Sequence, residues 1–92
     1  MIRSFKDRDT RHFFEGRRVA AYEGFAGQAA RRLVLLDSAE TLGDLAALPS
    51  NRLEALRGDR ASQHSIRINA QWRVCFCWTD EGPCDVEIVD YH

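Results

Sequence analysis

Lysine is almost absent from this 92-residue sequence, and long apolar segments are missing altogether. Of its 13 basic residues, 12 are arginine and only Lys6 is lysine. No segment approaches the roughly 18 consecutive apolar residues of a membrane-spanning helix, and residues 1–7 lack the apolar stretch of a secretory signal. With an odd number of cysteines, three, the sequence predicts a cytoplasmic protein with reduced thiols and no membrane partner.

Several motifs are missing as well. The sequence contains no glycine-rich loop that would cradle a phosphate and no nucleophile elbow. It also contains no internal repeat and no low-complexity linker. Its length corresponds to one domain, and 45% hydrophobic with 29% charged residues is ordinary for a globular protein. We therefore expect residues 1–92 to form a single domain.

The charged residues are unevenly distributed although the formal net charge is only −1. Residues 52–73 hold five arginines and two acids, whereas residues 80–90 hold five acids and no base. A fold that separates these segments would present a basic surface despite the nearly neutral total. Arginine suits such a surface because its planar fork matches phosphate oxygens and stacks on bases, although a GC-rich genome would also favour arginine codons.

Apolar residues recur at helical spacing in the first half of the sequence. They predict helices over residues 7–15, 28–37 and 41–48, with aspartate, serine or threonine available as N-caps. Residues 17–27, which are polar and contain two glycines, should be rich in loops.

The apolar period changes to two in the second half. Residues 65–68, 72–78 and 85–91 alternate in the manner of strands, and a short strand is also expected at residues 2–5. Helices first and antiparallel strands last predict an α+β fold, in which about three N-terminal helices pack on one face of a mainly antiparallel sheet of four to five strands.

The cysteines and nearby acids are the candidates for a metal site. Cys75 and Cys77 share a strand face, and Cys84 can approach them across a hairpin. A metal would need a fourth ligand and usually wider spacing, so we interpret all three as small buried apolar residues. Asp85 and Glu87 could in principle hold Mg²⁺, but exposed acids on an edge strand are the commoner case. We expect neither a metal nor another cofactor.

The sequence closes with Asp90, Tyr91 and His92, which all handle protons. A carboxylate, a phenol and an imidazole suit general acid–base chemistry, although terminal residues usually fray and composition alone favours a chance grouping. Arg73 should point away from the face that carries Trp72. Two interpretations of Arg73 remain open, a structural ion pair with an acid of the last strand and a phosphate clamp beside the terminal trio.

Arg57 and Arg60 flank a glycine–aspartate turn. Two guanidinium groups displayed on a turn suit contacts with a nucleic-acid backbone, and a solvated loop is the alternative. His12 and His64 are isolated in the sequence, so we expect surface or capping roles for them.

Taken together, these motifs resemble the RelE/HigB toxins, most closely the HigB branch. The likeness is carried by residues 1–6 (Met-Ile-Arg-Ser-Phe-Lys), 53–60 (Leu-x-x-Leu-Arg-Gly-Asp-Arg), 65–68 (Ser-Ile-x-Ile), 69–74 (Asn-Ala-Gln-Trp-Arg-Val) and 90–92 (Asp-Tyr-His). It spans nearly the whole chain, and the combination is far more specific than any one segment.

The resemblance implies a RelE-like fold, a helix-turn-helix antitoxin partner of the HigA type, and metal-free cleavage of mRNA in the A site of the 70S ribosome. It implies that Arg73, Asp90, Tyr91 and His92 are catalytic. The family's histidine is replaced here by Glu54, which can accept or orient a proton but cannot donate one as an imidazolium does.

The same resemblance suggests how the residues divide the work. Arg73 would stabilise charge at phosphorus, helped by Arg57, which stands where relatives have lysine. With Arg60 and Arg67, Arg57 would also bind RNA, and His92 would carry protons. Two alternatives remain, a ParE-like inhibitor of DNA gyrase on the same fold, and a non-enzymatic module whose arginine-rich face binds an acidic partner.

Overall fold

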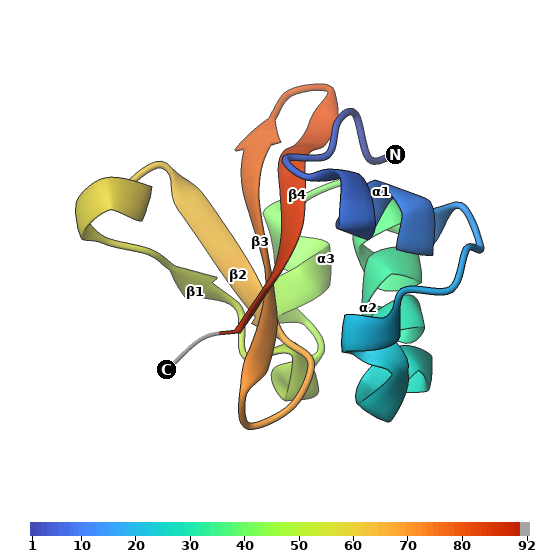
Figure 1. The fold of residues 1–92 in the computed structure, drawn as a ribbon. Coiled ribbons are helices and arrows are strands. Elements are labelled where there is room, and N and C mark those ends of the chain that lie inside the picture. Colours follow the sequence, from blue (N-terminus) through green and yellow to red (C-terminus); the bar gives the residue numbers. More distant parts are fainter. Residues whose placement is uncertain (91–92) are drawn as a thin grey trace.

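The computed structural model describes residues 1–90, and Tyr91 and His92 lie outside the described residues. Within that range three α-helices precede one four-stranded antiparallel sheet, so the predicted α+β fold is confirmed (Figure 1). The helices are α1 (Arg8–Phe14), α2 (Ala26–Ser38) and α3 (Leu42–Ala46). The strands, in both chain and spatial order, are β1 (Glu54–Ala55), β2 (Gln63–Arg67), β3 (Trp72–Thr79) and β4 (Gly82–Asp90).

The predicted caps start two of the helices. The Asp7 side chain accepts a hydrogen bond from the backbone N–H of Thr10 at the start of α1. Thr41 and Asp44 form a reciprocal capping box at α3, which satisfies backbone N–H groups that a short helix cannot pair internally. No helix within residues 1–90 has both the length and the apolar character needed to cross a membrane.

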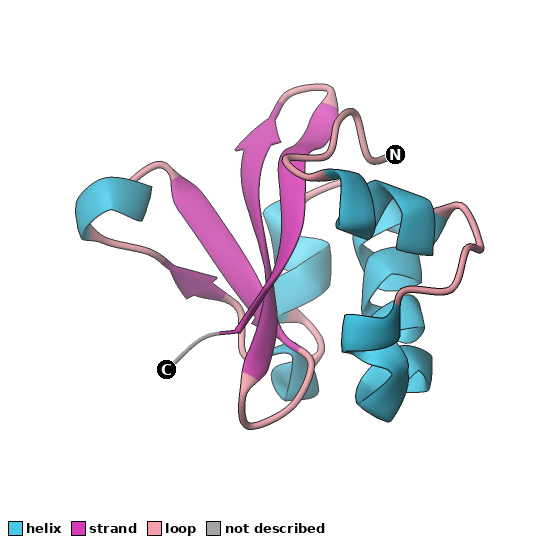
Figure 2. Cartoon of the chain, viewed as in Figure 1, coloured by secondary structure: helices cyan, strands magenta, loops and turns pink. Residues whose placement is uncertain are grey.

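The hydrophobic core lies between the helices and one face of the sheet (Figure 2). Ala29, Leu33 and Leu36 form a fully buried stripe at helical spacing on α2. They pack in one cluster with the alternate residues of the central strand, including Val74 and Phe76, which are also fully buried. Burial of each large side chain contributes about 1.5–3 kcal/mol, so this contact fixes which face of β3 turns toward the helices.

Residues 17–27 are more regular than predicted. Ala20–Phe25 form a 3₁₀ helix, in which Tyr22 and Phe25 are buried. Their rings lie 6.0 and 4.9 Å from the Trp72 ring, centroid to centroid. The glycines and polar residues conceal this, because tertiary contacts with Trp72 and with Phe13 of α1 bury the two aromatic side chains.

The strand predicted at residues 2–5 is present only as a single parallel bridge, between Phe5 and Val86. Backbone hydrogen bonds from Arg3 to Pro83 and from Val86 to Ser4 hold this segment along the outer edge of β4. The ladder is short because the chain turns into α1 immediately afterwards. Gly82 has φ +124°, and a Cβ there would lie 2.5 Å from the Met1 carbonyl oxygen, so this close approach requires glycine.

Thr10 ties α1 to the last strand. Its side chain is fully buried, and its hydroxyl oxygen accepts a hydrogen bond of 3.0 Å from the backbone N–H of Ile88. The Tyr22 hydroxyl lies 3.5 Å from the same oxygen. This contact holds β4 in place close to its end, where Asp90 lies.

Candidate active site

Arg73 lies on the sheet face that the helices leave uncovered. Its neighbours along β3, Trp72 and Val74, pack into the core, so alternation directs Arg73 to the opposite face, as predicted. In the ladder Arg73 pairs with Arg67 on β2 and with Val89 on β4. The Arg73 guanidinium therefore projects from a strand that is hydrogen-bonded to a neighbouring strand on each side.

Among the described residues, two acceptors hold the Arg73 guanidinium. Its Nε donates to the hydroxyl oxygen of Ser65 at 2.7 Å, and its Nη2 donates to the backbone carbonyl of Arg52 at 2.7 Å. Ser65 is fully buried, so the packed side chains around its hydroxyl group restrict its position. A guanidinium held at two points is preorganised for charge stabilisation, because it need not be reoriented when charge develops.

The carbonyl of Arg52 is held by the segment that precedes it. Arg52 follows the 3₁₀ turn Pro49–Asn51 with φ +45°, a left-handed conformation that typically costs a non-glycine residue about 1–3 kcal/mol. Asn51, fully buried, donates to the Leu45 carbonyl at 3.0 Å and accepts from the Arg32 guanidinium at 2.7 Å. This strained backbone presents its carbonyl to Arg73.

Sequence reasoning did not identify Ser65 or the Arg52 carbonyl as parts of the site. Strand alternation does place Ser65 on the same face as Arg73, and that signal was available. The Arg52 contact depends on a backbone oxygen 21 residues away, for which a sequence carries no local signal.

Glu54 lies on the same sheet face as Arg73, with β2 between their strands. It is exposed on β1 and is the cross-strand partner of Ser65, the residue that receives the Arg73 Nε–H. Directly opposed residues share a face, so Glu54 points to the same side of the sheet as Ser65 and Arg73. The structure thus places two of the predicted site residues on one face of the sheet.

Arg60 is already engaged within the protein. Its guanidinium donates to the Gln63 side chain at 2.9 Å and to Glu87 at 3.2 Å, and the ammonium of Lys6 lies 3.4 Å from the other Glu87 oxygen. The Glu87 side chain is only 14% exposed, so the pairing is better shielded than an ordinary surface ion pair. The ion pair between Arg60 and Glu87 therefore links the β1–β2 connection to β4.

Cys75, the cross-strand partner of Glu87, is fully buried, and burial raises the pKa of its thiol.

Two hollows on the surface are lined by arginines other than Arg73. Arg57 is exposed and lines a hollow of about 380 Å³ together with Glu54. Arg67, half-buried, lines a second groove of about 620 Å³ with Arg32 and Arg52. The Arg67 guanidinium donates to the Asn69 carbonyl at 3.1 Å, which orients it at the edge of this groove. Arg67 pairs with Arg73 in the ladder and the Arg52 carbonyl accepts its hydrogen bond, so this second groove adjoins Arg73.

Asp90 does not share the Arg73 face. It pairs in register with Trp72, and its carboxylate accepts a hydrogen bond of 3.1 Å from the Gln71 side chain. β4 nevertheless runs antiparallel to β3, so it brings the chain to the end of β3 that carries Trp72 and Arg73 (Figure 1). The predicted roles of Tyr91 and His92 fall outside the described residues.

His64 and His12 are not part of this face. His64 lies on the core side of β2, where its ring stacks on Phe76 with 6.2 Å between centroids, and His12 belongs to α1. Within residues 1–90 no imidazole thus lies beside Arg73. Glu54 and Glu87 are carboxylates on its face, and Glu87 is engaged by Arg60 and Lys6.

Comparison with known proteins agrees with the sequence motifs. A family model described as the RelE-like toxin of the type II toxin–antitoxin system HigB matches residues 3–92. Toxin HigB-1 of Vibrio cholerae serotype O1 is 35% identical over 82 residues, which cover 87% of this chain and 86% of the relative. Endoribonuclease HigB of Proteus vulgaris is 30% identical over 96 residues, with 100% of both chains covered. The chain therefore belongs to the HigB-like family of RelE-like toxins, the toxin half of a type II toxin–antitoxin pair.

Proposed function

We propose that this protein is an endoribonuclease that cuts mRNA on the ribosome and thereby arrests translation. The observation that carries the proposal is the Arg73 guanidinium, fixed between Ser65 and the Arg52 carbonyl beside an arginine-lined groove. A relative that covers the whole chain is named an endoribonuclease. A fixed guanidinium next to an arginine-lined groove suits a phosphodiester better than a protein partner. The guanidinium pairs with phosphate oxygens, and the groove can hold the backbone on either side of that phosphate.

The chemistry follows from the RNA itself. RNA carries its own nucleophile, the 2′-OH, which attacks the adjacent phosphorus once its proton is removed. The bond to the 5′-oxygen of the next nucleotide then breaks, and that oxygen takes up a proton. The products are a 2′,3′-cyclic phosphate and a 5′-OH, with no water consumed and no metal ion required. Arg73 stabilises the additional negative charge on the phosphoryl oxygens.

Glu54 is the candidate general base among the described residues. Its carboxylate shares a face with Arg73 and can accept the 2′-OH proton. His92, oriented by Asp90, is proposed as the proton donor to the leaving oxygen, because imidazole titrates near neutral pH. Tyr91 is proposed to stack on a base or to hydrogen-bond the phosphate. These last three assignments rest on the family motif.

Arg57 and Arg67 are proposed to bind the RNA backbone on the two sides of Arg73, with Arg32 and Arg52 extending the path along the groove. Such contacts position the RNA without reading its sequence, so they make binding strongly salt-dependent. Arg60, predicted to bind RNA, is proposed instead to hold the β1–β2 connection over the sheet through Glu87.

As the toxin of a type II pair, the protein has a cognate antitoxin. We propose that this antitoxin is a HigA-like helix-turn-helix protein and that it keeps the toxin from the 70S ribosome. A small helix-turn-helix gene adjacent to the gene of this chain would support the pairing.

The proposal is tested by inducing the protein in a bacterium and mapping mRNA 5′ ends against the reading frame. We expect new ends inside translated regions, in phase with codons, and none with Arg73→Ala at equal protein level. Arg17→Ala, which changes an exposed arginine outside both grooves, is the matched control and should cut normally. Arrested replication with intact mRNA would instead favour a gyrase-directed toxin.

A further inference from the structure

The ladder between β3 and β4 contains a bulge that the nuclease site does not use. Cys75 pairs with Glu87 and Cys77 pairs with Cys84, so β4 has one residue more than β3 between these two pairs. Val86 keeps its place in the core and is fully buried. The extra residue, Asp85, has φ +50°, in the left-handed region that non-glycine residues rarely adopt.

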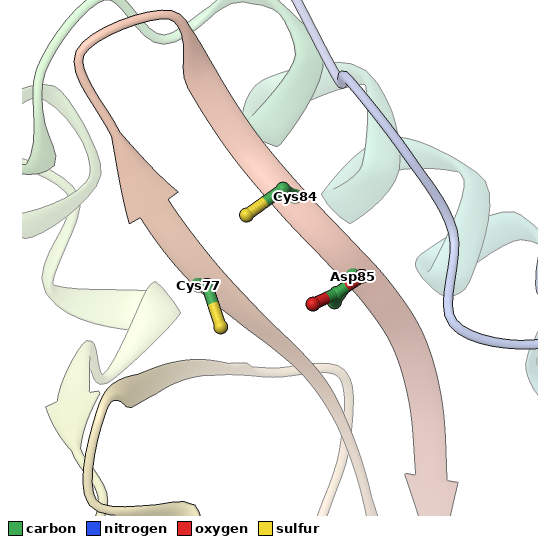
Figure 3. A group of neighbouring side chains, drawn as sticks. All are labelled: Cys77, Cys84 and Asp85. Atoms are coloured by element: carbon green, nitrogen blue, oxygen red, sulfur yellow. The ribbon is translucent and has the colours of Figure 1, made fainter.

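The bulge places three metal-binding atoms together. The sulfur atoms of Cys77 and Cys84 and a carboxylate oxygen of Asp85 all lie within 4.8 Å of one another. In Figure 3 the side chains of Cys84 and Asp85 extend from β4 toward β3, where Cys77 lies. The N-terminal segment steadies the bulge, because Ser4 accepts a hydrogen bond of 2.9 Å from the Asp85 backbone N–H.

The burial of these residues differs from the interpretation of all three cysteines as buried apolar side chains. Cys75 fits that interpretation, since it is fully buried. Cys77 and Cys84 are only half-buried, and Asp85 is exposed, so an ion can reach the cluster from solvent.

We propose that Cys77, Cys84 and Asp85 bind a zinc ion, with water as the fourth ligand. Two thiolates and one carboxylate favour zinc over magnesium or calcium, because thiolates are soft ligands. Tetrahedral zinc with bonds of about 2.3 Å to sulfur sets its two sulfurs roughly 3.8 Å apart. The two sulfurs, at most 4.8 Å apart, therefore need to close by no more than about 1 Å, which side-chain rotation supplies. Binding releases the two thiol protons to solvent.

A zinc ion bound here would cross-link β3 and β4 at the bulge. Cys77 lies four residues from Arg73 on the same strand, or about 13 Å at strand spacing, so the ion would be separate from the nuclease site. It would stabilise the fold and would leave the chemistry at Arg73 unchanged. The outcome of the test below is therefore independent of whether the protein cuts RNA.

The test is a cobalt(II) titration of the reduced full-length protein, followed by competition with zinc. We expect a thiolate-to-cobalt charge-transfer band that zinc abolishes. Cys84→Ser should remove the band, and Asp85→Asn should weaken binding at least about 10–100-fold, the range seen when even an outer-shell partner is lost. Cys75→Ala, a buried cysteine on the same strand, is the matched control and should keep the band.

Thermal melting provides a second measurement that requires no spectroscopic probe. Zinc at about 100 times its dissociation constant should raise the Tm of the unmodified chain by roughly 10–20 °C. The Tm of a folded Cys84→Ser variant should not respond. The proposal is overturned if the reduced protein gives no band, if Cys84→Ser keeps the band, or if the two thiols form only a disulfide and retain no metal.

Discussion

Ser65 is the residue whose substitution examines the preorganisation of Arg73 most closely. Its hydroxyl oxygen, 2.7 Å from the Arg73 Nε, is fully buried between β1 and β3. Ser65→Ala removes this acceptor but leaves the guanidinium charge and its second hydrogen bond, to the Arg52 carbonyl, in place. The substitution therefore changes how well Arg73 is held and does not remove it.

The size of the effect follows from the strength of the bond. Hydrogen bonds to charged groups contribute about 1.5–3 kcal/mol, and each 1.4 kcal/mol corresponds to about a tenfold change in rate. Because the Arg52 contact still restrains Arg73, we expect the lower end of this range. Ser65→Ala should lower kcat about 10-fold with little change in KM, since a positioning residue acts mainly in the transition state.

The assay is cleavage of ribosome-bound mRNA over a range of protein concentrations, at a temperature well below the Tm of every variant. Ser62→Ala is the matched control, because Ser62 is exposed in the β1–β2 connection. Ser65→Thr restores the hydroxyl and should recover part of kcat. If Ser65→Ala cleaves as fast as the unmodified protein, Arg73 does not depend on this hydrogen bond and the reasoning fails.

Three further predictions concern proton transfer and stability. Glu54→Gln should lower the cleavage rate about 10²–10⁴-fold, whereas Glu54→His should retain activity. Equal rates for Glu54→Gln and the unmodified protein would exclude Glu54 as the base. Thr10→Val leaves a buried N–H of β4 without its acceptor, so it should lower the free energy of unfolding by about 1–3 kcal/mol in urea denaturation, and an unchanged midpoint would contradict this. Hydrogen bonds from the backbone N–H groups of Glu40 and Thr41 hold the pKa of Asp44 below its usual range. The stability that this provides is present above the ordinary aspartate pKa of about 3.9 and is lost as the pH falls through the lower folded value, so Asp44→Asn should flatten the dependence of the Tm on pH in that acidic window.

The sequence predicted what local patterns control. Asp7 and Thr41 cap their helices as expected, and alternation along β3 correctly assigned Trp72 to the core face and Arg73 to the other. Each of these features depends on residues within one or two turns of helix, or on a period of two along one strand. Such patterns are read directly from the chain.

Features that depend on distant segments were not predicted. The expected strand at residues 2–5 is reduced to one bridge, because its pairing depends on the edge of β4 at the other end of the chain. Arg60 pairs with Glu87, 27 residues away, which no local pattern indicates. The extra residue at Asp85 shifts the pairing with β3, which no local pattern indicates, although Val86 and Ile88 face the core together as predicted.

The central claim is that Arg73 stabilises the charge that forms when the RNA 2′-OH attacks phosphorus. It is tested most directly by single-turnover cleavage of ribosome-bound mRNA by the unmodified protein and by folded Arg73→Ala, with analysis of the product ends. We predict a 2′,3′-cyclic phosphate and a 5′-OH, and a rate about 10²–10³-fold lower for the variant. Cleavage by Arg73→Ala at the unmodified rate, or products with a 5′-phosphate, would contradict the account.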